Sequence, residues 1–408
     1  MKLNLIIFVS QLSKQETALE EHKDILDRLN AEYDIHYVNP EDLEKPLEEG
    51  ATMVFIGSGG VEELVSAAID KLPKYVVLIA DGLKNSFAAS LEILSWMRLN
   101  NRNGRVIHGD LNYMMRTISD YMLAYNALQR LQGQRVGVIG KPSSWLIASN
   151  IDYKLIEDKW NVKLVDVPLD DVISRYEKIK DVEVEKLTDK FIDNSIKMIE
   201  PNRDDVLKAM RLYKAIKQMI EDNRLNAFTL NCFDLIPITK TTGCLALALL
   251  NEEGFPAGCE GDLQTILTML VVKTVTNEPS FMANPSKIID NDKHEMIFAH
   301  CTIAPCITEK YIIRSHYESL SGVAIEGIVS PQDVTILKCG GRNMERYFIS
   351  DARLLECTSN PNMCRTQMRL RLAEPLNYFL EQSIGNHHVI VKGSHKSEIE
   401  ALLKILNR

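Results

Sequence analysis

Several features that would define a protein class are missing from this sequence of 408 residues. Its eight cysteines are scattered and form no CxxC pair, which argues against a disulfide framework and favours reduced, mostly buried thiols. No stretch approaches the ~20 consecutive apolar residues of a membrane helix. The net charge is −9, without a clustered Lys/Arg stripe, so the chain carries no electrostatic footprint for nucleic acid. We therefore expect no nucleic-acid partner and no membrane partner.

Nucleotide-binding fingerprints are also missing. Gly57-Ser58-Gly59-Gly60 follows an apolar run, but it is not GxGxxG and no Walker lysine accompanies it, so neither a dinucleotide nor an ATP site is indicated. Its backbone N–H groups could hold an anion, although a tight strand-to-helix turn is the simpler interpretation. The apolar run 3–9 has no small-residue cleavage site after it. We interpret it as a first strand rather than a signal peptide and expect a cytoplasmic protein.

The first 132 residues alternate apolar strands with amphipathic helices. Strands are expected at 3–9, 33–38, 52–56, 75–79 and 105–107, and helices at 15–30 and 113–131. A second unit of the same kind, residues 133–287, opens with a strand near 135 and continues with strands at 162–167, 226–232 and 256–259. Such alternation predicts a doubly wound parallel sheet in each domain.

The pattern changes to period two from about residue 288. Strands are expected at 295–301, 311–315, 323–328, 335–338, 347–350 and 389–392, followed by a helix at 397–406. Period-two runs separated by glycine, proline and asparagine indicate an antiparallel barrel or sandwich over residues 288–408. The sequence therefore predicts an α/β protein with two doubly wound parallel-sheet domains and then a mainly antiparallel, β-barrel-like C-terminal domain.

Two acidic residues stand at a strand end in the second unit. Glu260 directly follows the strand 256–259, and Asp262 occupies the N-cap position of the apolar helix 263–275. Loops at strand ends of α/β folds usually build their sites. A helix cap explains Asp262, whereas Glu260 is equally compatible with a ligand or base and with a solvated loop acid.

Three histidines lie at strand ends in the C-terminal region. His300 ends one strand, and His387 and His388 lead into another, where their rings would face opposite ways and at most one would reach a given ion. Glutamate and imidazole ligands suit a divalent ion such as Mn²⁺. A lone histidine at a strand end is nevertheless more often a hydrogen-bonded structural residue.

Further polar side chains are candidates for contacts with a substrate. They are Asp262, Arg314, His316 and Arg365. Arginines on the face of a barrel are commonly solvated, so their residue type alone does not decide between the two roles.

These residues lie in segments that resemble the L-fucose and L-arabinose isomerases. The segments are Ala257-Gly258-Cys259-Glu260-Gly261-Asp262, Pro279-Ser280-Phe281-Met282-Ala283-Asn284, Phe298-Ala299-His300-Cys301-Thr302 and Gly385-Asn386-His387-His388. Arabinose isomerases have a similar Glu-Gly-Asp segment before an apolar helix, then Ser-Phe-Met, a strand ending in histidine and a late His-His. Fucose isomerases have the glutamate, an aspartate in the second segment and a late Gly-Asn-His. The resemblance extends from about residue 130 to the end.

The resemblance implies a three-domain protein that interconverts an aldose and a ketose through an ene-diol. It implies a divalent metal, most often Mn²⁺, a small-molecule sugar substrate and a homo-oligomer, either trimer or hexamer. Carried over residue by residue, Glu260 is a ligand and acid/base, His300 is a ligand, and His387 or His388 is another. The family's chemistry moves a proton between two carbons while the ion stabilises the enediolate charge.

The sequence departs from the family at its second active-site carboxylate, where Ala283 and Asn284 stand instead. The carbonyl of Asn284 can still bind a hard cation, and we retain it as a metal ligand and catalytic candidate, but an amide cannot take a proton. Asp262, Asp234 or Glu309 could compensate. We therefore predict a metal-dependent ketol isomerase of a monosaccharide or derivative. The alternatives are a catalytically altered sugar-binding or regulatory paralogue, and an enzyme with a changed reaction such as epimerisation.

Overall fold

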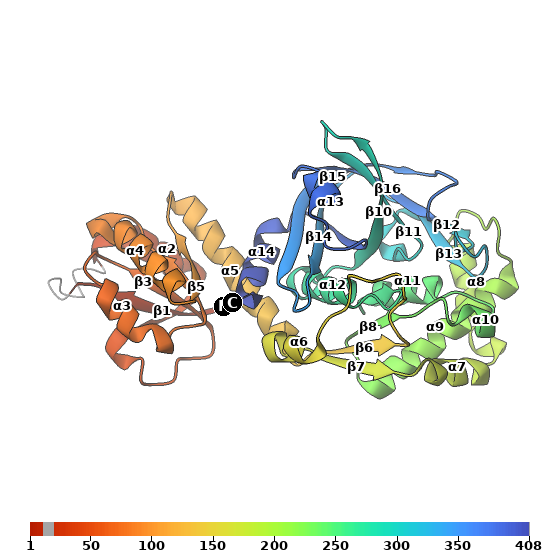
Figure 1. Ribbon diagram of the computed structural model, residues 1–408, viewed down its shortest axis with the longest axis horizontal. Helices are drawn as coiled ribbons and strands as arrows, with labels where there is room; N and C mark the ends of the chain where they lie inside the picture. Colours follow the sequence, from red (N-terminus) through yellow and green to blue (C-terminus); the bar gives the residue numbers. More distant parts are fainter. Residues whose placement is uncertain (11–19, 408) are drawn as a thin grey trace. The chain divides into compact units, whose positions relative to one another are not determined.

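The computed structural model describes residues 1–10 and 20–407 (Figure 1). They form two compact units. One consists of Met1–Asn126 together with the residues from Glu400 onwards, and the other is Ala127–Ile399. Among the described residues, none of the helices combines the length and the apolar character that crossing a membrane requires.

The first unit is built on a five-stranded parallel sheet of order β2-β1-β3-β4-β5. Its strands are β1 Lys2–Phe8, β2 Asp34–Val38, β3 Ala51–Ile56, β4 Tyr75–Ile79 and β5 Asn103–Ile107. The helices are α2 Lys23–Glu32, α3 Glu62–Ala68, α4 Ser86–Leu99 and α5 Leu111–Leu131, the last running on into the second unit. Central strands such as β1 are buried on both faces, as a parallel sheet covered by helices requires.

The glycine-rich segment 57–60 is a tight connection between β3 and α3. The N–H of Gly57 donates to the carbonyl of Phe8, and the N–H of Gly59 donates to the carbonyl of Lys84. These amides are therefore already used within the fold, in agreement with the turn interpretation.

The second unit begins with a four-stranded parallel sheet of order β7-β6-β8-β9. Its strands are β6 Arg135–Ile139, β7 Lys163–Val167, β8 Ala227–Leu230 and β9 Ala257–Cys259. Its helices are α6 Tyr153–Trp160, α7 Leu169–Lys178, α8 Glu185–Asp193, α9 Arg203–Asn223, α10 Ile236–Thr239, α11 Cys244–Glu252 and α12 Leu263–Thr276.

An antiparallel barrel completes the second unit, closed in the order β10-β11-β16-β15-β14-β17. Its strands are β10 Ser280–Asp290, β11 Glu295–His300, β14 Asp333–Gly340, β15 Arg346–Thr358, β16 Thr366–Leu372 and β17 His388–Lys392. A separate pair, β12 Lys310–Arg314 and β13 Ala324–Ile328, lies outside the barrel. The helix here is α13 Asn377–Glu381, and the last helix, α14 Lys396–Leu406, begins in this unit and continues into the first.

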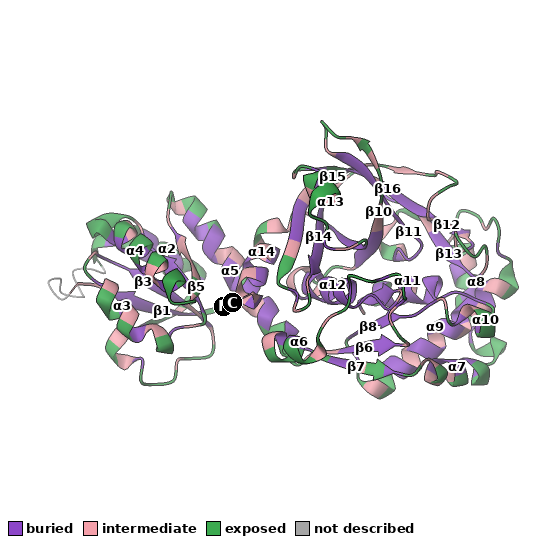
Figure 2. Cartoon of the chain, in the orientation of Figure 1, coloured by how far each residue is buried: buried purple, intermediate pink, exposed green. Residues whose placement is uncertain are grey.

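Helix α12 connects the two layers of this unit. It packs against β8 and β9 of the parallel sheet and against β10, β14 and β17 of the barrel. Its residues are buried almost throughout (Figure 2), which explains why its sequence is apolar on all sides rather than amphipathic. The N-terminus of this helix therefore lies where the parallel sheet and the barrel meet.

The predicted fold class is confirmed, since two parallel-sheet regions precede an antiparallel barrel. The predicted helix 15–30 lies partly outside the described residues, and its described part overlaps α2, which runs two residues further to Glu32. Strand β16 was not predicted from the sequence. The barrel begins with β10 at Ser280, within the segment 133–287 of the sequence-based division.

Glu200 ties β12 to the segment between α8 and α9. Its carboxylate accepts hydrogen bonds from Arg314 Nε at 2.9 Å and Nη2 at 2.6 Å and from the Ser315 N–H at 3.2 Å. Hydrogen bonding to Arg314 lowers the pKa of Glu200 from its ordinary 4.5 to about 2. A depressed pKa in the folded state stabilises the fold above the unfolded pKa, and this contribution is lost as pH falls towards the folded value.

We expect Glu200→Gln to lower the free energy of unfolding at pH 7 by about 1 kcal/mol, a modest value because the pair is partly exposed. The difference from wild type should shrink between pH 4.5 and pH 2, the interval in which the native carboxylate becomes protonated. Urea denaturation at several pH values measures it. Glu177→Gln, on the exposed face of α7, is the control. A deficit of Glu200→Gln that is independent of pH would contradict this account.

Candidate metal and substrate site

The site lies at the carboxyl ends of the parallel strands of the second unit. The sheet order β7-β6-β8-β9 means that the chain leaves β6 towards one edge and returns as β8 on the other side. Loops after strands at such a reversal usually form the binding crevice. Here the loop after β6 carries Trp145, the loop after β8 carries Phe233, and Glu260 directly follows β9.

Glu260 is held in an uncommon backbone conformation. Its φ is +62°, in the left-handed region, which a non-glycine residue seldom adopts and which is concentrated at functional positions. Its carbonyl accepts a hydrogen bond from Ser143 N–H at 2.9 Å. The following Gly261 has φ +70°, and a Cβ there would lie 2.7 Å from Pro142 Cα. The turn is thus fixed against the loop after β6, and its backbone conformation determines the direction of the Glu260 side chain.

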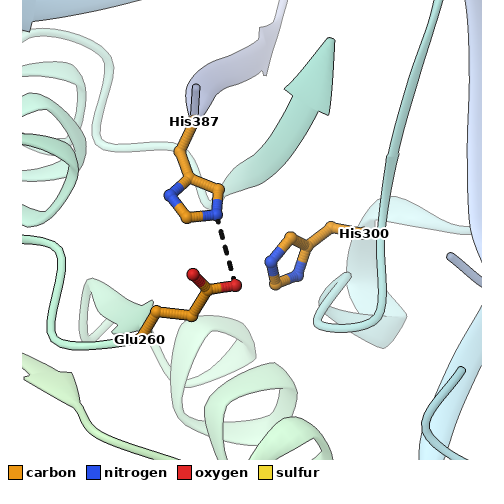
Figure 3. A group of neighbouring side chains, drawn as sticks. All are labelled: Glu260, His300 and His387. Atoms are coloured by element: carbon orange, nitrogen blue, oxygen red, sulfur yellow. Dashed lines mark ion pairs between the residues drawn. The ribbon is translucent and has the colours of Figure 1, made fainter. Parts of the chain in front are cut away.

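Two barrel strands bring histidines to this carboxylate. His300 is the last residue of β11, and His387 immediately precedes β17; β10 pairs with both strands. One ligand atom from each of Glu260, His300 and His387 lies within 4.8 Å of the other two (Figure 3). His387 Nε2 is 3.5 Å from Glu260 Oε1, and the two imidazole rings are 5.5 Å apart. Three residues from distant parts of the sequence therefore converge on one point.

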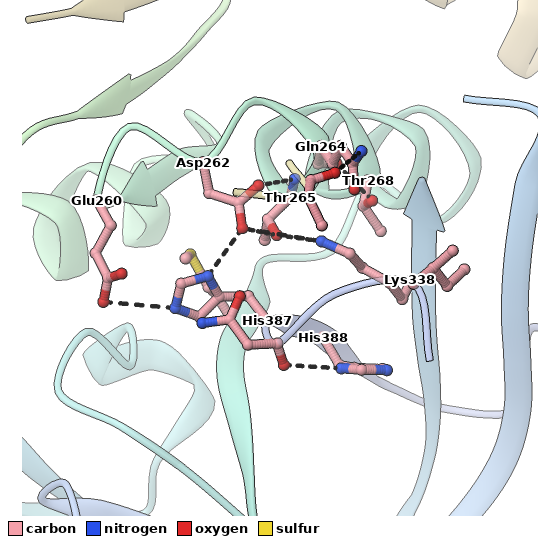
Figure 4. A network of polar contacts seen from close by, with 12 residues as sticks. Glu260, Asp262, Gln264, Thr265, Thr268, Lys338, His387 and His388 are labelled. Carbon is pink, nitrogen blue, oxygen red and sulfur yellow. Dashed lines mark hydrogen bonds and ion pairs between the residues drawn. The ribbon is translucent and has the colours of Figure 1, made fainter. Parts of the chain in front are cut away.

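Asp262 orients His387 from behind (Figure 4). Its Oδ2 lies 2.8 Å from His387 Nδ1, so this ring nitrogen donates and Nε2 is left facing Glu260. Nε2 is buried and has no hydrogen-bond partner among the described residues. A carboxylate behind a histidine is the arrangement that commonly orients histidine ligands of metal ions.

The electrostatic environment keeps two of the donors in the form that binds cations. Burial by itself raises the pKa of Glu260, but His387, together with His300 and Trp145, outweighs burial and lowers the pKa to about 2. Burial, followed by repulsion from His387, lowers the pKa of His300 to about 3, so its imidazole is neutral. For His387, burial opposes the proton, but the carboxylates of Asp262 and Glu260 raise the pKa. One carboxylate and two imidazoles form a donor set that fits a divalent cation.

A pocket borders two of these three residues, Glu260 and His300. Asn284 and His316 also line it, and Asn284 Oδ1 lies 3.4 Å from Asn386 Nδ2. Its remaining walls are mainly thiols and apolar groups, together with the exposed carboxylate of Glu318: Cys232, Phe233, Ile236, Thr242, Cys244, Cys259, Cys301, Glu318 and Cys364.

His388 turns away from the group that contains His387 (Figure 4). Its Nδ1 lies 3.1 Å from the carbonyl of Asn386, and its Nε2 lies 3.1 Å from the hydroxyl of Tyr378. The opposite orientation of the two neighbouring rings follows the strand alternation expected from the sequence. His387 is the one of the pair that faces Glu260.

The two arginines proposed for substrate contacts are engaged elsewhere. Arg314 pairs with Glu200 and Glu326, and Arg365 donates to the carbonyl of Ser315 at 2.8 Å and to its hydroxyl at 3.0 Å. Neither is among the residues that line the pocket. Asp262 is fully buried behind His387, whereas His316 lies at the pocket.

Sequence reasoning missed Trp145, Phe233 and Glu318. Trp145 Nε1 donates to Glu260 Oε2 at 2.6 Å, and its ring meets Phe233 edge to face at 5.0 Å. The order of strands would have pointed to the loops after β6 and β8, but that order is not visible in the sequence.

We expect Gly261→Ala to lower the free energy of unfolding by about 2–4 kcal/mol, combining left-handed strain with overpacking against Pro142. Gly133→Ala is the matched control, because Gly133 has φ +77° but nothing within 4 Å of an added Cβ. It should show the strain alone, about 1–2 kcal/mol. Chemical denaturation of the two variants compares them, and equal losses would show that the close approach at Gly261 is unimportant.

Comparisons with known proteins bear on residues around this site. Residues 154–278 match the family model of the L-arabinose isomerase central domain, a segment that contains Glu260 and Asp262. The chain is 24% identical over 217 residues to a sulfoquinovose isomerase of Clostridium sp. (strain MSTE9), covering 50% of this chain and 47% of that protein. It is 25% identical over 139 residues to L-arabinose isomerase 2 of Clostridium acetobutylicum, covering 32% of this chain and 28% of the relative.

The chain is also 26% identical over 144 residues to the L-arabinose isomerase of Acidothermus cellulolyticus, with 33% of this chain and 28% of that protein covered. It thus spans less than half the length of these curated relatives. These relatives are named as sulfoquinovose and L-arabinose isomerases, so they give no specific support to a fucose isomerase. Together the matches show that part of the chain is similar to L-arabinose and sulfoquinovose isomerases.

Proposed function

We propose that this protein is a metal-dependent ketol isomerase, which interconverts an aldose and a ketose through an ene-diol. The observation that carries the proposal is the convergence of Glu260, His300 and His387 beside a pocket. Glu260 also lies within the segment that matches the L-arabinose isomerase central domain. Proteins with isomerase names among the relatives support the same reaction class.

In the proposed mechanism, Glu260, His300 and His387 hold the divalent ion, for which we propose Mn²⁺. An ion at this position would polarise the carbonyl of an open-chain sugar and stabilise negative charge on the enediolate. Glu260 is ionised at neutral pH because its pKa is about 2, so it can bind a cation. We also assign the transfer of the substrate proton to Glu260, as the resemblance to the sugar isomerases implies. Trp145 fixes one of its oxygens by donating a hydrogen bond.

The reaction needs a second group that exchanges a proton. The three carboxylates that the sequence suggested for this role are not among the residues that line the pocket. Asp262 is occupied behind His387, Asp234 accepts from Asn231 at 2.9 Å, and Glu309 accepts from Ser330. Among the described residues that line the pocket, the carboxylate other than Glu260 belongs to Glu318. We propose that Glu318 supplies the proton exchange that Asn284 cannot.

Mn²⁺, a homo-oligomeric assembly of three or six chains and a cytoplasmic location belong to the same proposal. The resemblance to the sugar isomerases supports the ion and the assembly, and the reduced-thiol composition supports the location. Arabinose and sulfoquinovose appear in the names of relatives, and we propose a monosaccharide or a derivative as substrate here.

A second candidate function is a sugar-binding or regulatory paralogue without turnover. The observation in its favour is the amide of Asn284 at the pocket wall, where the related isomerases are expected to carry a carboxylate. Stoichiometric metal together with sugar binding, but no conversion across a panel of aldoses and ketoses, would favour this function over the isomerase.

We expect the purified protein to bind stoichiometric Mn²⁺ and to exchange an aldose with its ketose. Removal of the ion with a chelator should abolish turnover, and Glu260→Gln should weaken metal binding and lower kcat by about 10²–10⁴-fold. Metal analysis and a coupled isomerase assay over a sugar panel measure both. Full activity of Glu260→Gln on the best substrate would overturn the proposal.

We expect Glu318→Gln to separate proton transfer from metal binding. Metal stoichiometry should stay at the wild-type value, because Glu318 is not one of the three converging residues, while kcat falls by about 10²-fold. Glu177→Gln, at an exposed position that is not among the residues lining the pocket, should leave both quantities unchanged. An undiminished kcat in Glu318→Gln would exclude it as the second proton carrier.

A further inference from the structure

A lysine lies completely buried behind the site. Lys338, on β14, has a fully buried side chain, although lysines are almost never fully buried unless a partner holds the charge. Its Nζ donates to Thr265 Oγ1 at 2.9 Å and lies 3.8 Å from Asp262 Oδ2. The proposed reaction makes no direct use of this group.

The contacts of Lys338 lead through Thr265 and Asp262 to His387 (Figure 4). Thr265 accepts from Lys338 and donates its own hydroxyl proton to Asp262 Oδ2 at 2.8 Å. The same Oδ2 accepts from His387 Nδ1 at 2.8 Å, and Asp262 Oδ1 accepts the Thr265 N–H at 2.8 Å. Asp262 is thus held at both oxygens, and its direction determines the direction of the imidazole ring.

The absence of a side chain at Gly385 leaves room for Lys338. Gly385 has φ +152°, and a Cβ there would lie 3.0 Å from Lys338 Cε and 3.3 Å from Nζ. The glycine that stands two residues before His387 therefore lies directly against the lysine stem. Lysine, glycine and histidine form one packed arrangement, and this gives a physical reason for a glycine in Gly385-Asn386-His387-His388.

We propose that Lys338 is a positioning residue of the metal site, which acts through Thr265 and Asp262 to hold the His387 ring with Nε2 facing the ion. The inference rests on the proposed function, because it assumes that His387 is a ligand. Lys338 supplies the counter-charge for Asp262 where water cannot, and it orients the Thr265 hydroxyl towards that carboxylate. Without Lys338, Asp262 keeps its hydrogen-bond donors but loses the neighbouring cation, and the Thr265 hydroxyl loses the donor that orients it towards Asp262.

The test compares the Mn²⁺ affinity of the metal-free 408-residue protein and its variants by competition with a chelator, after circular dichroism has verified folding. Lys338→Met keeps the volume of the side chain and removes its charge, and Thr265→Val removes the relay hydroxyl but keeps the backbone N–H. We expect Lys338→Met to bind Mn²⁺ about 10–100-fold more weakly, the range for loss of groups that orient metal ligands. Thr265→Val should lose about 10-fold.

Thr268→Val is the matched control. Thr268 lies on α12 and accepts a hydrogen bond from Cys339 N–H of β14 at 3.1 Å, but it does not contact Asp262. Its replacement should destabilise the same helix–barrel contact without weakening Mn²⁺ binding. In a double-mutant cycle, Lys338→Met should cost no further affinity once Asp262 is asparagine, whereas an independent packing defect would add to the loss.

Each outcome decides the inference. If wild type binds Mn²⁺ and the folded Lys338→Met and Thr265→Val variants bind it equally well, Lys338 has no positioning role and the proposed function stands. Equal losses in Thr265→Val and Thr268→Val would assign the effect to packing and overturn the inference. If Lys338→Met does not fold, Thr265→Val decides alone, with wild-type affinity as the contradicting result. Absence of Mn²⁺ binding by wild type would overturn both proposals.

Discussion

The hydrogen bonds and ion pair of the buried Asp262 carboxylate connect the parts of the second unit. This carboxylate caps α12 by accepting the Thr265 N–H, and it accepts the His387 N–H from the segment that enters the barrel. A carboxylate without exposure to water is costly unless it is hydrogen-bonded and paired, and here the partners come from the helix, the barrel and Lys338. The parallel sheet and the barrel are therefore joined through the same group that orients the proposed metal site.

Much of this arrangement was predictable from local sequence. The strand 256–259, the glutamate after it and the apolar helix that follows define the position of Glu260, because a parallel strand ends at the edge where sites form. Strand periodicity also predicted that His387 and His388 face opposite ways, which their contacts bear out. In each case the interaction that decides the structure lies within a few residues of the chain.

The unpredicted parts depend on contacts between distant segments. Strand β16 alternates apolar residues with Arg369 and Arg371, so its period-two pattern was present in the sequence; the sequence does not show that both arginines pair with the buried Glu295 of the neighbouring β11. Trp145 reaches Glu260 because the loop after β6 folds across the end of β9, and Lys338 is tolerated because Asp262 lies on the facing helix. Sequence alone assigns such charged or aromatic side chains to solvent, since it does not reveal which partner compensates them.

The order of the three site residues in the sequence has a consequence for biosynthesis. Glu260 comes first, His300 follows, and His387 belongs to the strand that pairs with β10 and β14 and so closes the barrel. Ribosomes deliver the chain from its N-terminus, so the last of the three converging residues leaves the exit tunnel well over a hundred residues after the first. A nascent chain therefore displays the acidic residue of the site long before the pocket exists, and capture of a cation by the complete set must await barrel closure.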